Sequence, residues 1–186
     1  TLPVIHELTE AQERELAADA RCLLMAVCLL NHWSFARIIA TYTYTEAEGI
    51  AYLMKLERLG LISVLPENRV RLLVSREFSW RPAGPIQQFF QLHVEPAFMD
   101  SPFSRPGEMR LFVHGMLTPA AHAKLAQRLR RVVQEFSDLH TESTEAAEPE
   151  RFGTSLLLAF RAWEPPIFAR LRREPDARRY PVVAPE

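Results

Sequence analysis

The stretch Thr45–Val74, TEAEGIAYLMKLERLGLISVLPENRVRLLV, places the narrowest limits on the fold of this chain. Thr45 is followed three residues later by Glu48, which is a capping box, so a helix is expected to begin here and run to Leu59. Gly60 then suits the left-handed position that ends a helix. Beyond it, apolar and polar residues alternate on both sides of a Pro-Glu-Asn turn, which indicates a β-hairpin. This order is typical of the third helix and wing of a winged helix-turn-helix.

The residues before this stretch predict three further helices. Thr9 and Gln12 form another capping box, and the helix that they open extends to about Ala17. Asp19 can cap a buried helix over residues 20–31, and Ser34 can cap a short third one. We therefore predict an N-terminal winged-helix-like module over residues 1–78.

The second half of the chain has a different pattern. SWRPAGP, at residues 79–85, begins a linker with an aromatic-rich helix, which we expect to span residues 79–108. Apolar strands are predicted at Met109–Leu117 and Thr154–Trp163, on either side of an amphipathic helix that Thr118 and Pro119 open. Two such strands are parallel if they pair directly, and a third strand or a symmetry mate must complete the sheet.

The predicted fold class is therefore α+β, with the winged-helix-like module followed by a β-α-β domain. This domain, for dimerisation or sensing, is predicted over residues 109–173, and a flexible tail over residues 174–186.

Charge and cysteine content limit the classes of function. The formal net charge is −1, and the first 80 residues hold eight basic and ten acidic side chains, so no global basic excess announces nucleic-acid binding. Cys22 and Cys28 fit two buried thiols in a reducing cytosol, with a redox pair as the alternative. No signal peptide or membrane-length apolar run is visible, which favours a cytoplasmic protein. The chain starts with Thr1, so we expect it to be a fragment of a longer one.

We find no catalytic constellation. HExxH, GxSxG, P-loop and GxGxxG motifs are absent, and His114 and His140 match no metal-ligand spacing. The carboxylates at residues 7–15 and 141–150 fit solvated faces rather than acid/base pairs. We therefore predict a protein that is not an enzyme and needs no cofactor and no metal.

The basic residues that could approach DNA are few. Lys55 and Arg58 lie on the outer face of the predicted third winged-helix helix, and Arg69 and Arg71 lie on the wing. Glu46 and Glu48 occupy the N-terminus of that helix, which is otherwise a favourable place for a phosphate. The stretch therefore fits a scaffold for packing or protein contacts better than a reader of bases. Basic residues at 128, 130 and 131 fit a solvated helix face, with a nucleic-acid patch as the alternative.

Aromatic residues gather where the two halves meet. A small-molecule pocket there would be lined by Trp80, Phe89, Phe90 and Phe98. The alternative is that these rings belong to the core or to a dimer contact.

Four segments of the chain resemble the region downstream of the DNA-binding domain in a group of bacterial transcriptional regulators. These regulators carry a Cro/CI-like helix-turn-helix of the xenobiotic-response-element class at their N-terminus. The resemblance spans about residues 8–173 and rests on LTEAQERELAADARCLLMAVCLLNHW, SFARIIATYTYTEAEGIAYLMKLERLGLISVLPENRVRLLV, WRPAGPIQQFF and GTSLLLAFRAWE.

The resemblance implies the downstream part of a regulator, providing dimerisation and sensing of an unknown small-molecule effector. It implies a homodimer, with DNA bound through an upstream domain that this chain lacks, and no membrane partner. The alternatives are an autonomous winged-helix DNA-binding protein and an enzyme with an unrecognised site near His114 or His140.

Overall fold

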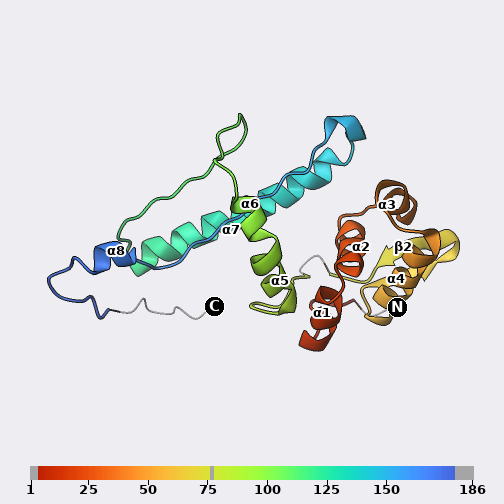
Figure 1. Cartoon of the computed structure of the whole chain (residues 1–186), viewed down its shortest axis with the longest axis horizontal. Coiled ribbons are helices and arrows are strands. Elements are labelled where there is room, and N and C mark those ends of the chain that lie inside the picture. The colour runs from red at the N-terminus through yellow and green to blue at the C-terminus, as the bar shows by residue number, and fades with distance from the viewer. Residues whose placement is uncertain (1–3, 76–77, 179–186) are drawn as a thin grey trace. The chain divides into compact units, whose positions relative to one another are not determined.

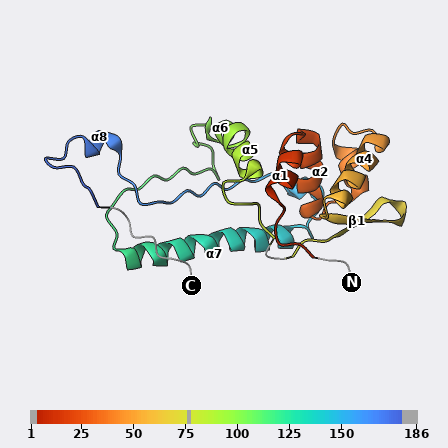
Figure 2. The ribbon, with the colours of Figure 1, turned by 90° about the horizontal axis from the view of Figure 1, so that it is seen from below.

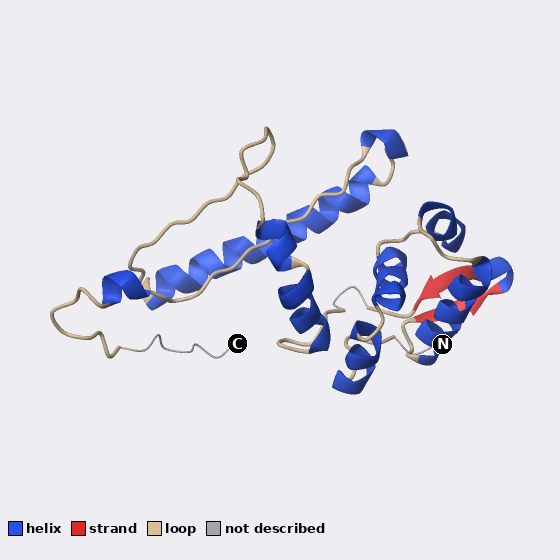
Figure 3. Ribbon diagram, in the orientation of Figure 1, coloured by secondary structure: helices blue, strands red, loops and turns tan. Residues whose placement is uncertain are grey.

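The computed structural model describes residues 4–75 and 78–178. The chain divides into two compact units, Thr1–Pro102 and Phe103–Glu186. The described residues combine helices with a small two-stranded antiparallel sheet, an α+β composition (Figure 3).

Four helices begin the first unit, and each starts where the sequence predicts a cap (Figure 1). Side-chain oxygens of Thr9, Asp19, Ser34 and Thr45 accept backbone N–H groups of the first turn, and both predicted capping boxes are formed. The caps satisfy donors that no helical partner can reach, so these boundaries were predictable. The helices are α1 (Glu10–Ala17), α2 (Ala20–Leu30), α3 (Phe35–Thr41) and α4 (Glu46–Arg58).

The predicted hairpin is confirmed and lies beside α4 (Figure 2). β1 (Ile62–Leu65) pairs with β2 (Arg69–Leu72), with Val64 opposite Val70. The 3-10 turn η1 (Pro66–Asn68) joins them. Gly60 adopts a φ of +82°, as its position after α4 predicts, because a side chain is disfavoured there. Ile5 extends the sheet with a parallel bridge to Val74.

The hydrophobic core of the first unit lies among these elements. Leu16, Met25, Ile38, Leu53 and Leu56 are essentially inaccessible to solvent. The segment 79–108, predicted as a linker with an aromatic-rich helix, contains two short helices, α5 (Pro85–His93) and α6 (Glu95–Met99). α5 packs against α1 and contributes buried Ile86 to the same core.

The second unit is built around α7 (Pro119–Ser143), which begins at the predicted cap Thr118 and continues into the predicted acidic loop. It is followed by the 3-10 turn η2 (Glu148–Glu150) and the short helix α8 (Pro166–Ala169). No residue of α7 is buried. Of the predicted tail 174–186, residues 174–178 form no helix or strand, and residues 179–186 lie outside the described part.

The two predicted strands of the second unit are loops in the structure (Figure 3). Met109–Leu117 and Thr154–Trp163 form no strand pairing, and their apolar side chains remain exposed, from 37% for Leu157 to 91% for Val113. The physical reason is that two strands in one chain bury too little surface to stabilise a sheet. The apolar pattern of these segments is therefore unsatisfied within the described residues.

Candidate nucleic-acid interface

The outward face of α4 carries little positive charge. Gly49, Leu53 and Leu56 face the core and are buried. The exposed residues on the opposite side are Ala47, Ala51, Met54 and Arg58, with Met54 65% exposed. This face is small and mostly apolar, and Arg58 is the one side chain on it that could donate to a base edge or a phosphate.

One of the two predicted basic residues of α4 is paired with a neighbouring helix. The Arg58 guanidinium forms an ion pair with the Glu15 carboxylate of α1. Lys55 is only partly exposed and lies close enough to buried Cys22 for its charge to act on the thiol. Burial outweighs that charge and raises the pKa of Cys22 to about 11. The Arg58 side chain remains 67% exposed, so its availability to a phosphate is limited by the ion pair with Glu15 and not by burial.

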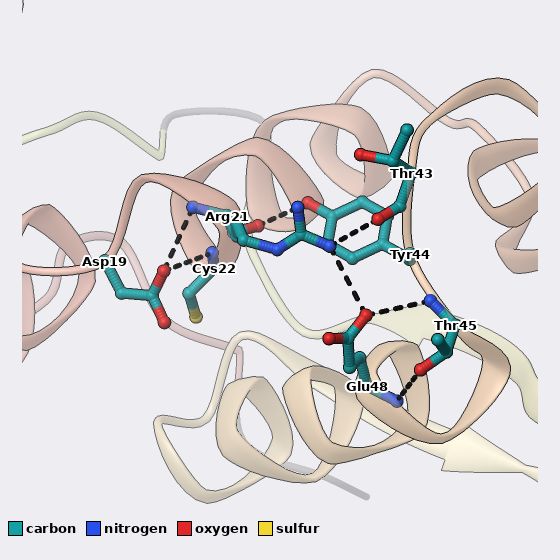
Figure 4. Close-up of polar contacts among 7 residues, drawn as sticks. All are labelled: Asp19, Arg21, Cys22, Thr43, Tyr44, Thr45 and Glu48. Carbon is teal, nitrogen blue, oxygen red and sulfur yellow. Dashed lines mark hydrogen bonds and ion pairs between the residues drawn. The ribbon is translucent and has the colours of Figure 1, made fainter.

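The N-terminus of α4 is occupied by a carboxylate of the protein (Figure 4). Glu48 accepts a 2.8 Å hydrogen bond from the Thr45 N–H, and Thr45 Oγ1 accepts a 3.1 Å hydrogen bond from the Glu48 N–H. The backbone hydrogen bond of Thr45, together with the charge of Arg21, lowers the pKa of Glu48. A negative charge is therefore held where an incoming phosphate would meet the helix dipole.

Arg21 connects this end of α4 to α2. Its guanidinium lies 3.4 Å from the Glu48 carboxylate and also donates to the Thr43 carbonyl (Figure 4). The same group lies over the Tyr44 ring, 4.6 Å from its centroid, and the Tyr44 hydroxyl donates to the Arg21 carbonyl. Burial raises the pKa of Tyr44 to about 12. These contacts serve as a structural brace between α2 and α4.

The wing presents the remaining two candidates. Arg69 and Arg71 are both exposed and alternate along β2, which places them on one face of the hairpin. Ser63 lies opposite Arg71, and Leu65 lies opposite Arg69. The Arg69 side chain donates to the Pro66 carbonyl at 3.3 Å. Of the four predicted DNA contacts, Arg58, Arg69 and Arg71 are exposed and Lys55 is partly exposed, and Arg58 is paired with Glu15.

A hollow next to the wing was not predicted from the sequence. It has a volume of about 390 Å³ and lies between the α2–α3 connection and the hairpin turn. His32, Glu67 and Asn68 line it, and all three have a positive φ. Trp33, on the same side, stacks on Tyr42.

The four residues of the predicted aromatic pocket do not gather around one hollow. A hollow of about 420 Å³ is lined by Trp80, Ile86, Gln87, Phe90, Gln91 and Glu95. Phe89 lies outside this lining, and its ring contacts Phe90 and His93. Phe98, on α6, is also not part of the lining. Two of the four predicted rings, Trp80 and Phe90, therefore line one open hollow. The spacing of aromatic residues along the chain did not show which of the four rings would do so.

Glu13 is a buried carboxylate, although the sequence placed it on a solvated face. It is inaccessible to solvent, and its oxygens accept hydrogen bonds from the Arg81 N–H at 2.7 Å and the Ile86 N–H at 3.4 Å. Gly84, the N-cap of α5, has no side chain to cap that helix. Glu13 of α1 therefore supplies the negative charge at the N-terminus of α5, which explains why these helices pack together.

Within the described residues, no group of three or more His, Cys, Asp or Glu side chains is arranged to hold a metal ion. None of the described helices combines the length and apolar character that crossing a bilayer requires. No family model, no curated protein and no solved structure matches the chain.

Proposed function

We propose that this chain is a non-enzymatic part of a bacterial transcriptional regulator. In this proposal the first unit is a winged-helix scaffold, and the second unit assembles two copies through a β-α-β arrangement. A Cro/CI-like domain upstream would bind the DNA. The order of capped helices and hairpin supports the winged-helix assignment, and the resemblance of the sequence to such regulators supports the regulatory role.

The surface of α4 is the single observation that carries the proposal, because it favours contact with protein over reading of DNA. In a winged helix-turn-helix, the outward face of this helix enters the major groove. Here that face offers Ala47, Ala51, Met54 and an Arg58 already paired with Glu15. Apolar and small side chains suit a protein partner better than a phosphate backbone.

The second unit supports assembly because its two apolar loops remain largely exposed, although the Phe112 and Trp163 rings contact each other. Met109–Leu117 and Thr154–Trp163 expose large side chains that a sheet would bury. A second copy would supply two more such segments, which is enough for a sheet of ordinary size. The proposed β-α-β arrangement therefore forms only on dimerisation.

A DNA-binding assay tests the first part of the proposal. We expect fluorescence anisotropy of a labelled duplex to show no salt-sensitive binding by this chain, even at low ionic strength. Phosphate contacts release counterions, so real binding would weaken steeply with added salt. Salt-sensitive binding that is lost on Met54→Glu would show that α4 enters the groove, and would refute the scaffold role.

Autonomous DNA binding is the second candidate, and the wing favours it. Exposed Arg69 and Arg71 share one face of the hairpin, where wings contact phosphates. If that candidate is correct, the Arg69→Ala/Arg71→Ala variant should lose most of its affinity and show a salt slope lower by about two. Arg14→Ala, at an exposed site on α1, is the matched control.

Size-exclusion chromatography with light scattering tests the assembly. We expect the mass of two chains at micromolar concentration. A strict monomer at every concentration would refute the assembly part without affecting the DNA result.

A further inference from the structure

The charged residues of α7 form a column whose order reverses about its middle. Along the helix the column reads Lys124, Arg128 and Arg131, followed by Glu135, Asp138 and Glu142. Successive members are three or four residues apart, so all six lie on one side of the helix. Three cations are followed by three carboxylates, and their positions are symmetric about residue 133.

This column is separate from the apolar stripe of α7. Leu125, Leu129, Val132, Phe136 and Leu139 each follow a member of the column by one residue, so the stripe lies about 100° around the helix axis. Between 36% and 53% of the side-chain surface of Leu125, Val132, Phe136 and Leu139 is exposed. If the stripe faces the two apolar loops, as the proposed β-α-β arrangement requires, then the column points sideways along the layer of helices.

The charges do not stabilise α7 on its own. Four neighbouring pairs in the column carry like charges, which is unfavourable at this spacing, and only Arg131 and Glu135 are opposite. The first turn of α7 has no acidic residue, and Glu142 lies in the last turn, which is the reverse of what the helix dipole favours.

The column also has few partners within the chain. Among the described residues, none of its six members forms an ion pair, and Asp138 accepts a hydrogen bond from Gln134 at 3.0 Å. The cost of this arrangement is therefore not offset within one chain.

A neighbouring helix with the reverse order of charges would offset the repulsion within the column. An antiparallel second copy of α7 presents that order. Under a two-fold axis near residue 133, Lys124 faces Glu142 of the second copy, Arg128 faces Asp138 and Arg131 faces Glu135. Each pair occurs twice, so six opposite-charge pairs replace the repulsions. A parallel pairing would instead place like charges together.

We propose that the charged column of α7 specifies a homodimer in which the two α7 helices lie side by side and antiparallel. This inference rests on the proposed assembly role of the second unit. It adds the partner, its orientation and the six residues that select it. In this arrangement the two α7 helices lie on the same face of the proposed sheet. The apolar stripe of each helix can then pack against that sheet.

Charge reversal in the 186-residue chain provides the test, and sedimentation equilibrium measures the dimer dissociation constant. The all-acidic variant K124E/R128E/R131E and the all-basic variant E135K/D138K/E142K should each raise the dimer dissociation constant by about 100-fold or more, because six exposed ion pairs become repulsive. An equimolar mixture of the two should form a one-to-one heterodimer. Combining all six changes inverts the column and should restore the homodimer.

The matched control places new charges on the far side of α7. Ala123, Arg130 and Ser137 are exposed and lie away from both the column and the stripe. The variant A123E/R130E/S137E should dimerise as the wild type does. Circular dichroism should show equal helix content in all variants, and recovery of association in the mixture shows that the separate variants are folded.

Cysteine crosslinking tests the orientation. A mixture of K124C and E142C chains should give a mixed disulfide, and neither variant alone should crosslink to itself. Self-crosslinking of K124C would overturn the antiparallel order. A wild-type dimer that both charge-reversal variants preserve would overturn this inference alone, whereas a wild-type monomer would refute the proposed assembly as well.

Discussion

Replacing the buried carboxylate of Glu13 by an amide should weaken the first unit substantially. Glu13→Gln keeps the size of the side chain but removes its charge and turns one acceptor into a donor. The two oxygens of Glu13 accept the N–H groups of Arg81 and Ile86, and no part of the residue is exposed. In the variant, one of these N–H groups must face an amide NH₂.

The magnitude follows from the contacts. A hydrogen bond to a charged group contributes about 1 kcal/mol more than a neutral one, and an unsatisfied buried donor costs about 1–3 kcal/mol. Loss of the negative charge at the N-terminus of α5 adds up to about 1 kcal/mol. We therefore expect the free energy of unfolding to fall by about 2–4 kcal/mol, or the melting temperature by roughly 10–20 °C for a unit of this size.

Guanidinium titration followed by circular dichroism measures this change. Glu10→Gln on the same helix is the matched control, because Glu10 is 65% exposed in an ion pair with Arg14 and should contribute under about 0.5 kcal/mol. A Glu13→Gln variant as stable as the Glu10→Gln control would refute the role of Glu13 as the cap of α5.

Three further outcomes are expected from the same titrations. Gly84→Ala places a Cβ 2.8 Å from Glu13 Oε1 and should destabilise by about 1–3 kcal/mol, whereas Gly115→Ala, with open space around it, should not. Gly60→Ala forces a side chain into a φ of +82° and should cost about 1 kcal/mol, although nothing lies near the new methyl group. Burial raises the pKa of Cys22 from 9.0 to about 11. As pH rises, the thiol therefore ionises in the unfolded chain before it ionises in the folded one. About 2 kcal/mol of stability should therefore be lost as pH rises from 9 to 11, and Cys22→Ala should flatten that loss; an unchanged slope would contradict it.

Features that depend on neighbouring residues were predictable from the sequence, and features that depend on distant residues were not. The caps at Thr9 and Thr45 were predictable because they are hydrogen bonds within one turn. The hairpin and Gly60 were predictable for the same reason, since turn chemistry acts over a few residues. The candidate site was less predictable: Lys55 and Arg58 were correctly placed on α4, but nothing in their spacing showed that Glu15 and Cys22 would be their neighbours.

By itself, the sequence determined where the helices of the first unit begin, where the hairpin turns, and how charge is ordered along α7, since each depends on residues within one or two helical turns. Only the tertiary structure decided that Glu13 is buried and that Arg58 is paired, because both depend on residues more than 40 positions away. It also decided that Met109–Leu117 and Thr154–Trp163 remain loops in a single chain. An apolar strand pattern predicts that a segment will be buried. Burial of a strand requires partner strands, and residues 4–75 and 78–178 supply none for these two segments.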